Sequence, residues 1–207
     1  MSAVTYKTDK ADQSRARILD AAARLFREEG YAAVSLRAIA AAAGMKGGSV
    51  YYHFESKQAI VIEVLDTGII AVHGKVAHTI DSLPAESTAA ETLRAGILAH
   101  LQALFEFSDY SSANVRIYSQ VPGAARESNR RLRREYEALW GRLVERFVER
   151  GEIRFGTDTR AFILLLIGSL NATLEWFDIN RGNLQGLAAS YSDVLLNGVL
   201  AERETKS

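Results

Sequence analysis

The sequence predicts an all-α protein of about nine helices, and three observations lead to this fold class. Apolar residues recur at intervals of three and four along most of the 207 residues, which is the period of an amphipathic helix. No run alternates apolar and polar residues over the length of a strand. Only two prolines interrupt the chain, Pro84 and Pro122, so long helices are sterically permitted between them.

The first helix is expected over about residues 13–29, because apolar residues form one face there: Ile18, Ala21, Ala22, Leu25 and Phe26. Gly30 is expected to end it as a C-terminal cap. Ser35 then offers an N-cap oxygen for a second, shorter helix that reaches about Ala43.

Gly44 is expected to end the second helix, and a third short helix is predicted over residues 46–52. Ser56 can cap a fourth helix that reaches about Ile80. Two short helices joined at a glycine have the spacing of a helix-turn-helix motif, whose second helix enters the major groove of DNA.

The remainder of the chain predicts five further helices. Thr88 and Glu91 have the spacing of a capping box, Pro122 follows the sixth helix, and Gly151 closes the seventh. The eighth is the most apolar segment of the chain. These helices are expected at about residues 88–105, 112–120, 127–150, 158–181 and 183–201.

Composition excludes several classes of protein. The absence of cysteine rules out disulfides and zinc–thiolate sites and fits a reducing compartment. No apolar run reaches the roughly 18 residues that a membrane span needs, and the polar N-terminus lacks the apolar centre of a signal peptide. We therefore expect a cytoplasmic protein with no membrane partner, no cofactor and no bound metal.

The formal net charge of zero hides an asymmetry between the two parts of the chain. Residues 1–57 contain nine Lys or Arg and six Asp or Glu, a net of +3, whereas residues 58–207 contain sixteen and nineteen, a net of −3. A basic N-terminal part is a weak indication of a polyanionic partner, and chance is the alternative.

The stretch "AAAGMKGGSVYYHFESKQ", residues 41–58, combines glycines, tyrosines and basic residues between two helical patterns. Glycine destabilises a helix interior by roughly 1 kcal/mol relative to alanine, so the glycines of this stretch need an explanation. Gly47 and Gly48 remove side-chain bulk where a backbone has to approach DNA. Lys46 and Ser49 can reach base edges or phosphates from the start of the third helix.

The hydroxyl groups of Tyr51 and Tyr52 are long enough to reach phosphates, and His53 and Lys57 follow them. Each residue also has a structural interpretation. The glycines can mark a loop, one tyrosine of such a pair usually faces the core, His53 can be structural, and the lysines can be solvated. Val50 and Phe54 are expected in the core.

The segment Ile18–Ile60 resembles the DNA-binding region of TetR-family transcriptional regulators. The resemblance covers about a quarter of the chain and rests on an Ala-rich first helix with Leu-Phe, then Gly-Tyr, and on these positions: Ser35, Ile39-Ala40, Ala43-Gly44, Gly48, Tyr51, His53-Phe54 and Lys57. This chain departs from the family at Lys46, where a Ser or Thr often caps the recognition helix.

The resemblance implies a homodimeric, ligand-responsive repressor on a near-palindromic operator, with a DNA-binding domain at residues 1–57 and a ligand-binding and dimerisation domain at 58–207. An activator is the alternative. By the same resemblance, phosphate contacts fall on Ser35, Tyr51, His53 and Lys57, and base contacts on Lys46, Gly47, Ser49 and Tyr52. We add Arg37 as a further contact to the DNA backbone.

The last two helices are too apolar to face water alone, and Gly168 and Ala172 permit close helix contact. We expect them to pair with a second subunit, as the resemblance also implies; the alternative is that they form the core of one subunit. The expected interface residues are Phe162, Leu165, Leu166, Ser169, Ala172, Tyr191 and Leu195.

The larger domain is expected to contain an apolar pocket with a few polar groups. Arg116 is the most suggestive candidate because a partly buried Arg needs an anionic partner; Glu175 can be that partner, which would make the pair structural. A lipophilic molecule, an aromatic compound or an acyl-CoA would fit. The candidate ligand residues are Tyr110, Arg116, Tyr118, Trp140, Asn171, Glu175 and Trp176, and each of them can instead be structural.

The sequence gives less support to two other classes of function. An enzyme is disfavoured because the sequence has no Gly-x-Ser-x-Gly elbow, no phosphate-binding Gly-Lys-Ser/Thr loop, no dinucleotide fingerprint and no His-Glu-x-x-His. A helical protein-interaction module leaves the glycine and tyrosine cluster unexplained.

Overall fold

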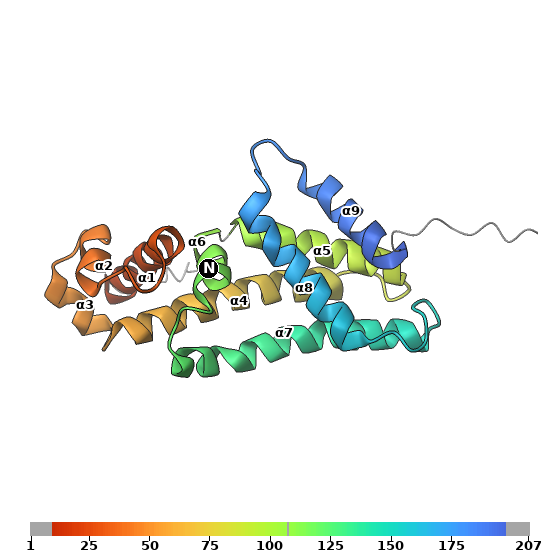
Figure 1. Cartoon of the computed structure of the whole chain (residues 1–207), viewed down its shortest axis with the longest axis horizontal. Coiled ribbons are helices and arrows are strands. Elements are labelled where there is room, and N and C mark those ends of the chain that lie inside the picture. Colours follow the sequence, from red (N-terminus) through yellow and green to blue (C-terminus); the bar gives the residue numbers. More distant parts are fainter. Residues whose placement is uncertain (1–9, 107, 198–207) are drawn as a thin grey trace, which may run out of the picture. The chain divides into compact units, whose positions relative to one another are not determined.

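The computed structural model describes residues 10–106 and 108–197, and these ranges form nine helices without a strand, which confirms the predicted fold class (Figure 1). The described chain divides into two compact units. The first unit contains residues 10–71 and 108–134, and the second contains residues 72–106 and 135–197.

The first unit is built around three helices at the N-terminus, drawn in red to orange in Figure 1: α1 (Lys10–Glu29), α2 (Leu36–Ala42) and α3 (Gly47–His53). It also contains the start of α4 (Lys57–Asp81), α6 (Ser108–Ile117) and the start of α7 (Gly123–Glu149). Helix α1 packs against both α2 and α6. The buried side chains of this core include Ile18, Phe26, Ile39, Val50, Ile60 and Ile117.

The second unit contains the remainder of α4 and α7 together with α5 (Ala89–Glu106), α8 (Thr159–Trp176) and α9 (Leu184–Asn197). Helix α5 contacts both α8 and α9. Trp140 is fully buried and fixes the approach of α7 to α5, because a Cβ atom at Gly96 would lie 2.7 Å from its ring. Only glycine leaves room for the indole at that position.

Several predicted helix boundaries are wrong. Helix α6 begins at Ser108 and ends at Ile117, earlier than the predicted 112–120. Helix α8 ends at Trp176 instead of residue 181, because Phe177 adopts an extended conformation and packs its ring on Phe105, 5.7 Å between centroids. The predicted end of the last helix at residue 201 lies outside the described residues.

The compact units do not follow the boundary expected between residues 57 and 58. The first unit extends along α4 to residue 71 and takes in α6 and the start of α7. Gly68 allows the backbones of α4 and α6 to meet, since a Cβ atom there would lie 2.8 Å from the carbonyl oxygen of Tyr110. The division between residues 57 and 58 stays a prediction about which residues bind DNA and which bind the ligand.

Candidate nucleic-acid interface

The turn between α2 and α3 is fixed by its end residues. The Ser35 Oγ accepts a hydrogen bond of 3.1 Å from the Ala38 N–H and so caps α2. Gly44 ends α2 with a φ of +67°, a conformation that favours glycine. Val50 and Phe54 are buried, as predicted, and this burial sets which face of α3 points outward.

The outward face of α3 carries two large aromatic side chains. Tyr51 is 62 % exposed and Tyr52 is 83 % exposed. The expectation that one tyrosine of the pair faces the core is therefore wrong, since Val50 and Phe54 fill that side of the helix. Nothing within the first unit requires two aromatic rings in water at this place, which indicates a partner.

Lys46 occupies the N-cap position of α3 and forms no side-chain cap hydrogen bond, as expected for a group without an acceptor. Its side chain is exposed. The ammonium group is therefore available to a partner at the N-terminal end of α3.

Gly47 and Gly48 have no structural reason to be glycine. Neither has a positive φ, and a Cβ atom added to either would have no atom within 4 Å. Both lie on the exposed side of the first turn of α3. The sequence motif indicated a close approach of the DNA at these glycines, and the open space around them supports that interpretation.

Lys57 was expected to contact a phosphate, but its ammonium group already has two partners within the protein. The Nζ donates hydrogen bonds of 2.7 Å to the carbonyl oxygens of Tyr31 and Val34. Burial lowers the pKa of Lys57. A structural role for Lys57 thus stands beside the predicted phosphate contact, for which one N–H remains.

The other predicted DNA residues are exposed or half-buried. Arg37 is exposed on the first turn of α2, and Ser35 can donate its hydroxyl hydrogen to a phosphate while its oxygen caps the helix. Ser49 and His53 are half-buried. The His53 ring packs edge-on against Tyr52, 5.0 Å between centroids, and so orients this exposed aromatic side chain.

A buried polar cluster lies in the second unit, where the sequence had singled out only Asn171. The His100 Nδ1 lies 2.6 Å from the Tyr136 hydroxyl, and its Nε2 lies 3.3 Å from the Asn171 Oδ1. Because the amide oxygen can only accept, Nε2 donates and Nδ1 accepts from Tyr136. Burial lowers the pKa of His100 to about 4, while the bond to Asn171 opposes the shift.

The remaining ligand candidates of the second unit differ in burial. Trp140 is fully buried beside Tyr136, and its Nε1–H has no hydrogen-bond partner among the described residues. Trp176 is 59 % exposed and Glu175 is exposed as well. Both lie near the end of α8 on its outward side, which favours a contact outside this unit over a pocket lining.

The candidates of the first unit do not form a common site. Tyr110 donates a hydrogen bond of 2.7 Å to Asp20, and burial raises its pKa. The Arg133 guanidinium stacks on Tyr118 at 3.7 Å from the ring centroid. Arg116 is exposed, so the expectation that it is partly buried is wrong.

The outward face of α8 is apolar and exposed. Leu165 is 62 % exposed, and the same stripe carries Ala161, Leu164, Gly168 and Ala172. Leu166 is fully buried within its own unit, so its predicted place at a subunit interface is wrong: it is one position, or about 100°, round the helix from Leu165. Leu164 belongs to the exposed stripe although it is not among the predicted interface residues.

The other predicted interface residues flank this stripe. Phe162, Ser169 and Leu195 are half-buried, and the Tyr191 hydroxyl donates to the Ser169 carbonyl oxygen at 3.3 Å. In the described part of the chain, no helix is long and apolar enough to cross a membrane. The same residues contain no group of three His, Asp or Glu side chains arranged to hold a metal ion.

Two family models match the chain. Residues 18–64 match the model described as bacterial regulatory proteins, tetR family, and residues 86–199 match the model of a tetracyclin repressor-like C-terminal domain. The first match covers the helix-turn-helix, and the second covers more than half of the chain.

Individual proteins agree with the family models. The chain is 29 % identical over 195 residues to the HTH-type transcriptional repressor KstR2 of Rhodococcus jostii, covering 89 % of this chain and 90 % of the relative. It is 27 % identical over 191 residues to the fatty acid metabolism regulator protein of Bacillus subtilis, covering 88 % and 93 %. The solved TetR-family regulator PfmR of Thermus thermophilus superposes with a TM-score of 0.79 at 26 % identity, covering 91 % and 98 %.

Proposed function

Because the chain belongs to the tetR family of bacterial regulatory proteins, we propose that it is a ligand-responsive transcriptional repressor that binds operator DNA as a homodimer. The observation that carries this proposal is the outward face of α3, where Tyr51 and Tyr52 are exposed beside two glycines with open space. In a helix-turn-helix motif this face lies in the major groove.

The exposed groups divide into two kinds of contact. Hydroxyl, guanidinium and imidazole groups of the motif suit phosphates, which fix the register of the protein on the duplex: Ser35, Arg37, Tyr51 and His53. Groups on the first turns of α3 suit base edges: Lys46, Gly47, Ser49 and Tyr52. Two such motifs in a two-fold dimer require half-sites about 34–36 Å apart on a near-palindromic operator.

The effector site is assigned to the second unit, around the cluster of His100, Tyr136 and Asn171. Because the Asn171 oxygen is occupied by His100, its amide N–H groups remain for a ligand acceptor. The surrounding core is apolar, which suits a lipophilic effector with few polar atoms. A relative named as a fatty acid metabolism regulator supports this class of ligand.

Release from DNA requires that the effector prefer one conformation of the dimer. A ligand that binds more tightly to a state whose two recognition helices are wrongly spaced shifts the population toward that state. We place this regulator in the cytoplasm, where it meets both the genome and the effector.

Selection of bound fragments from the source genome by the purified full chain, followed by footprinting, tests the proposal. The expected result is a protected near-palindrome whose affinity falls steeply as salt rises, because phosphate contacts release counterions. Fragments bound without sequence preference, or half-sites far from one helical turn apart, would contradict the proposal.

A further inference from the structure

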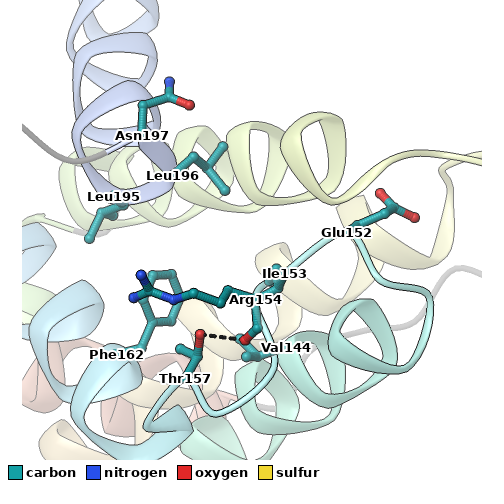
Figure 2. A pocket seen from close by; sticks show the side chains of 9 residues that line it. All are labelled: Val144, Glu152, Ile153, Arg154, Thr157, Phe162, Leu195, Leu196 and Asn197. Atoms are coloured by element: carbon teal, nitrogen blue, oxygen red, sulfur yellow. Dashed lines mark hydrogen bonds between the residues drawn. The ribbon is translucent and has the colours of Figure 1, made fainter. Parts of the chain in front are cut away.

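A hollow of about 440 Å³ lies in the second unit, where the end of α7, the loop of residues 150–158, the start of α8 and the end of α9 meet (Figure 2). This volume lies within the range of about 300–1,000 Å³ that small-molecule sites occupy. The hollow is separate from the His100 cluster, and it is lined by Val144, Glu152, Ile153, Arg154, Thr157, Phe162, Leu195, Leu196 and Asn197.

The hollow combines apolar walls with the guanidinium group of Arg154. Figure 2 shows the Arg154 side chain extending across it, with Leu195 on one side and Phe162 and Thr157 on the other. Among the described residues, Arg154 has no ion-pair partner. A guanidinium group so placed can hold a carboxylate through two parallel hydrogen bonds.

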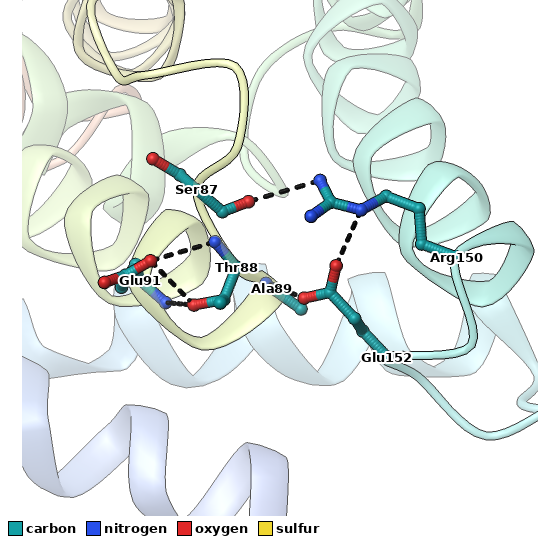
Figure 3. A network of polar contacts seen from close by, with 6 residues as sticks. All are labelled: Ser87, Thr88, Ala89, Glu91, Arg150 and Glu152. Atoms are coloured by element: carbon teal, nitrogen blue, oxygen red, sulfur yellow. Dashed lines mark hydrogen bonds and ion pairs between the residues drawn. The ribbon is translucent and has the colours of Figure 1, made fainter.

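Glu152, the acidic residue in the lining, does not cancel this charge. One of its carboxylate oxygens lies 2.7 Å from the Arg150 Nε, and the other accepts a hydrogen bond from the Ala89 N–H (Figure 3). Since Glu152 and Arg150 neutralise each other, the hollow has a net charge of +1 from Arg154.

The loop that carries Arg154 is anchored to the start of α5. Arg150 donates through Nη1 to the Ser87 carbonyl oxygen at 3.2 Å, and Thr88 and Glu91 form the capping box of α5 (Figure 3). A site whose wall is held in place before binding loses less conformational entropy when a ligand enters.

Two residues of the lining, Phe162 and Leu195, are also among the residues expected at the subunit interface, but neither belongs to the exposed stripe of α8. The exposed stripe of α8 follows Leu165, Gly168 and Ala172, whereas Phe162 lies on the flank between that stripe and the buried face of the helix. On α9, Leu195 and Leu196 lie either side of the buried Ala188 and Ser192 face. The position of the lining thus favours a small molecule over a second copy.

We propose that this hollow binds an amphipathic monoanion, with a carboxylate on Arg154 and an alkyl or aryl tail against Phe162, Leu195 and Leu196. This site goes beyond the proposed function and does not depend on it. Asn197 can supply an amide N–H at the rim for the carboxylate, whereas the Thr157 hydroxyl donates to the Arg154 carbonyl oxygen at 2.7 Å and so holds the loop.

Titration calorimetry of the full chain with decanoate, below its aggregation concentration, tests the proposal. One decanoate per chain is expected, with affinity reduced at least tenfold in Arg154→Gln. The matched control is Arg160→Gln, which removes an exposed charge on the first turn of α8 outside the lining. Decanol is expected to bind the wild type no more tightly than decanoate binds Arg154→Gln.

A decanoate carrying a photoreactive diazirine on its tail gives the location. Cross-links in the peptides that contain Phe162 or Leu195 would support the site. Equal binding by Arg154→Gln and wild type, cross-links confined to other peptides, or dissociation of the dimer by decanoate would each overturn it. Operator binding by Arg154→Gln is measured in parallel, so that failure of this site and failure of the DNA-binding proposal are distinguished.

Discussion

The ammonium group of Lys57 lies 4.2 Å from the centre of the Tyr31 ring and 2.7 Å from the carbonyl oxygen of the same residue. A second bond of 2.7 Å to the Val34 carbonyl oxygen joins the start of α4 to the turn between α1 and α2. The Tyr31 N–H donates to Gln120 Oε1 at 3.2 Å, so the turn is also tied to the segment between α6 and α7. Lys57 therefore positions the helix-turn-helix.

Replacement of Lys57 by Met is expected to lower the free energy of unfolding by about 1–3 kcal/mol, because two carbonyl oxygens lose their donor. Urea unfolding at fixed protein concentration measures this loss. The slope of operator affinity against salt separates the structural role from the predicted phosphate contact. If the role is structural alone, the slope stays that of the wild type.

Arg37→Met is the comparison for that experiment. Arg37 is exposed, so its loss should leave unfolding unchanged and reduce the salt slope by about 0.9 for each phosphate contact removed. If Lys57→Met has a shallower slope of operator affinity against salt and an unaltered free energy of unfolding, Lys57 contacts a phosphate. Its internal hydrogen bonds then contribute little to stability.

Gly47→Ala and Gly48→Ala are expected to weaken operator binding at least tenfold without loss of stability. A Cβ atom at either position meets no protein atom within 4 Å, and alanine favours a helix over glycine by up to about 1 kcal/mol. The new methyl groups would instead meet DNA. Gel-shift titration with the footprinted operator measures the affinity.

Gly74→Ala is the matched control, because Gly74 is exposed within α4 and likewise has open space around it. It should behave as the wild type on DNA. Unaltered operator affinity in Gly47→Ala and Gly48→Ala would show that these glycines do not mark a close approach of the duplex.

The buried positions of α3 and its C-cap could be predicted from the sequence, since Val50 and Phe54 follow from the 3.6-residue period of the apolar positions. The internal bonds of Lys57 could not, because their acceptors are backbone carbonyls whose direction depends on the turn at residues 31–34. The apolar period also cannot distinguish the exposed Leu165 from the buried Leu166, because nearly every position of α8 is apolar.

The polar cluster of the second unit was beyond prediction for another reason. His100, Tyr136 and Asn171 belong to three helices far apart in sequence, and only packing brings them together. A single histidine in an apolar helix carries no signal of its partners. The helical spacing of Asn171 and Glu175 puts both on one face of α8, and this pattern carries no information about the bond to His100.

Stability is expected to fall as the pH is lowered from about 6.5 to about 4, owing to His100. Burial lowers the pKa of this histidine to about 4 in the folded chain, against about 6.5 when unfolded. Between these values the unfolded chain binds a proton that the folded chain does not, so the free energy of unfolding drops with pH. The expected loss from His100 is on the order of 2 kcal/mol between pH 7 and pH 5.

Urea unfolding of the wild type and His100→Gln at both pH values measures this contribution. The variant is expected to lose less stability on acidification, whereas His78→Gln, at an exposed position, should match the wild type. An equal loss in His100→Gln would assign the acid sensitivity to other groups.

The exposed stripe of α8 predicts that Leu165→Glu abolishes the dimer while the subunit stays folded. Leu165 is 62 % exposed in one subunit, so a carboxylate there costs the monomer little, but burial of an unpaired charge between two subunits is strongly unfavourable. A cost of about 3 kcal/mol corresponds to a dissociation constant raised more than 100-fold. Sedimentation velocity measures this change.

Ile70→Glu is the control, because Ile70 is an apolar residue 54 % exposed on α4 and outside the stripe. It should remain dimeric, with operator affinity near that of the wild type. Leu165→Glu should bind the palindrome as weakly as a single half-site, since two linked recognition helices act as one bivalent ligand. If Leu165→Glu remains a dimer and protects both half-sites, subunit contact lies on another face, and the apolar stripe of α8 requires a different partner.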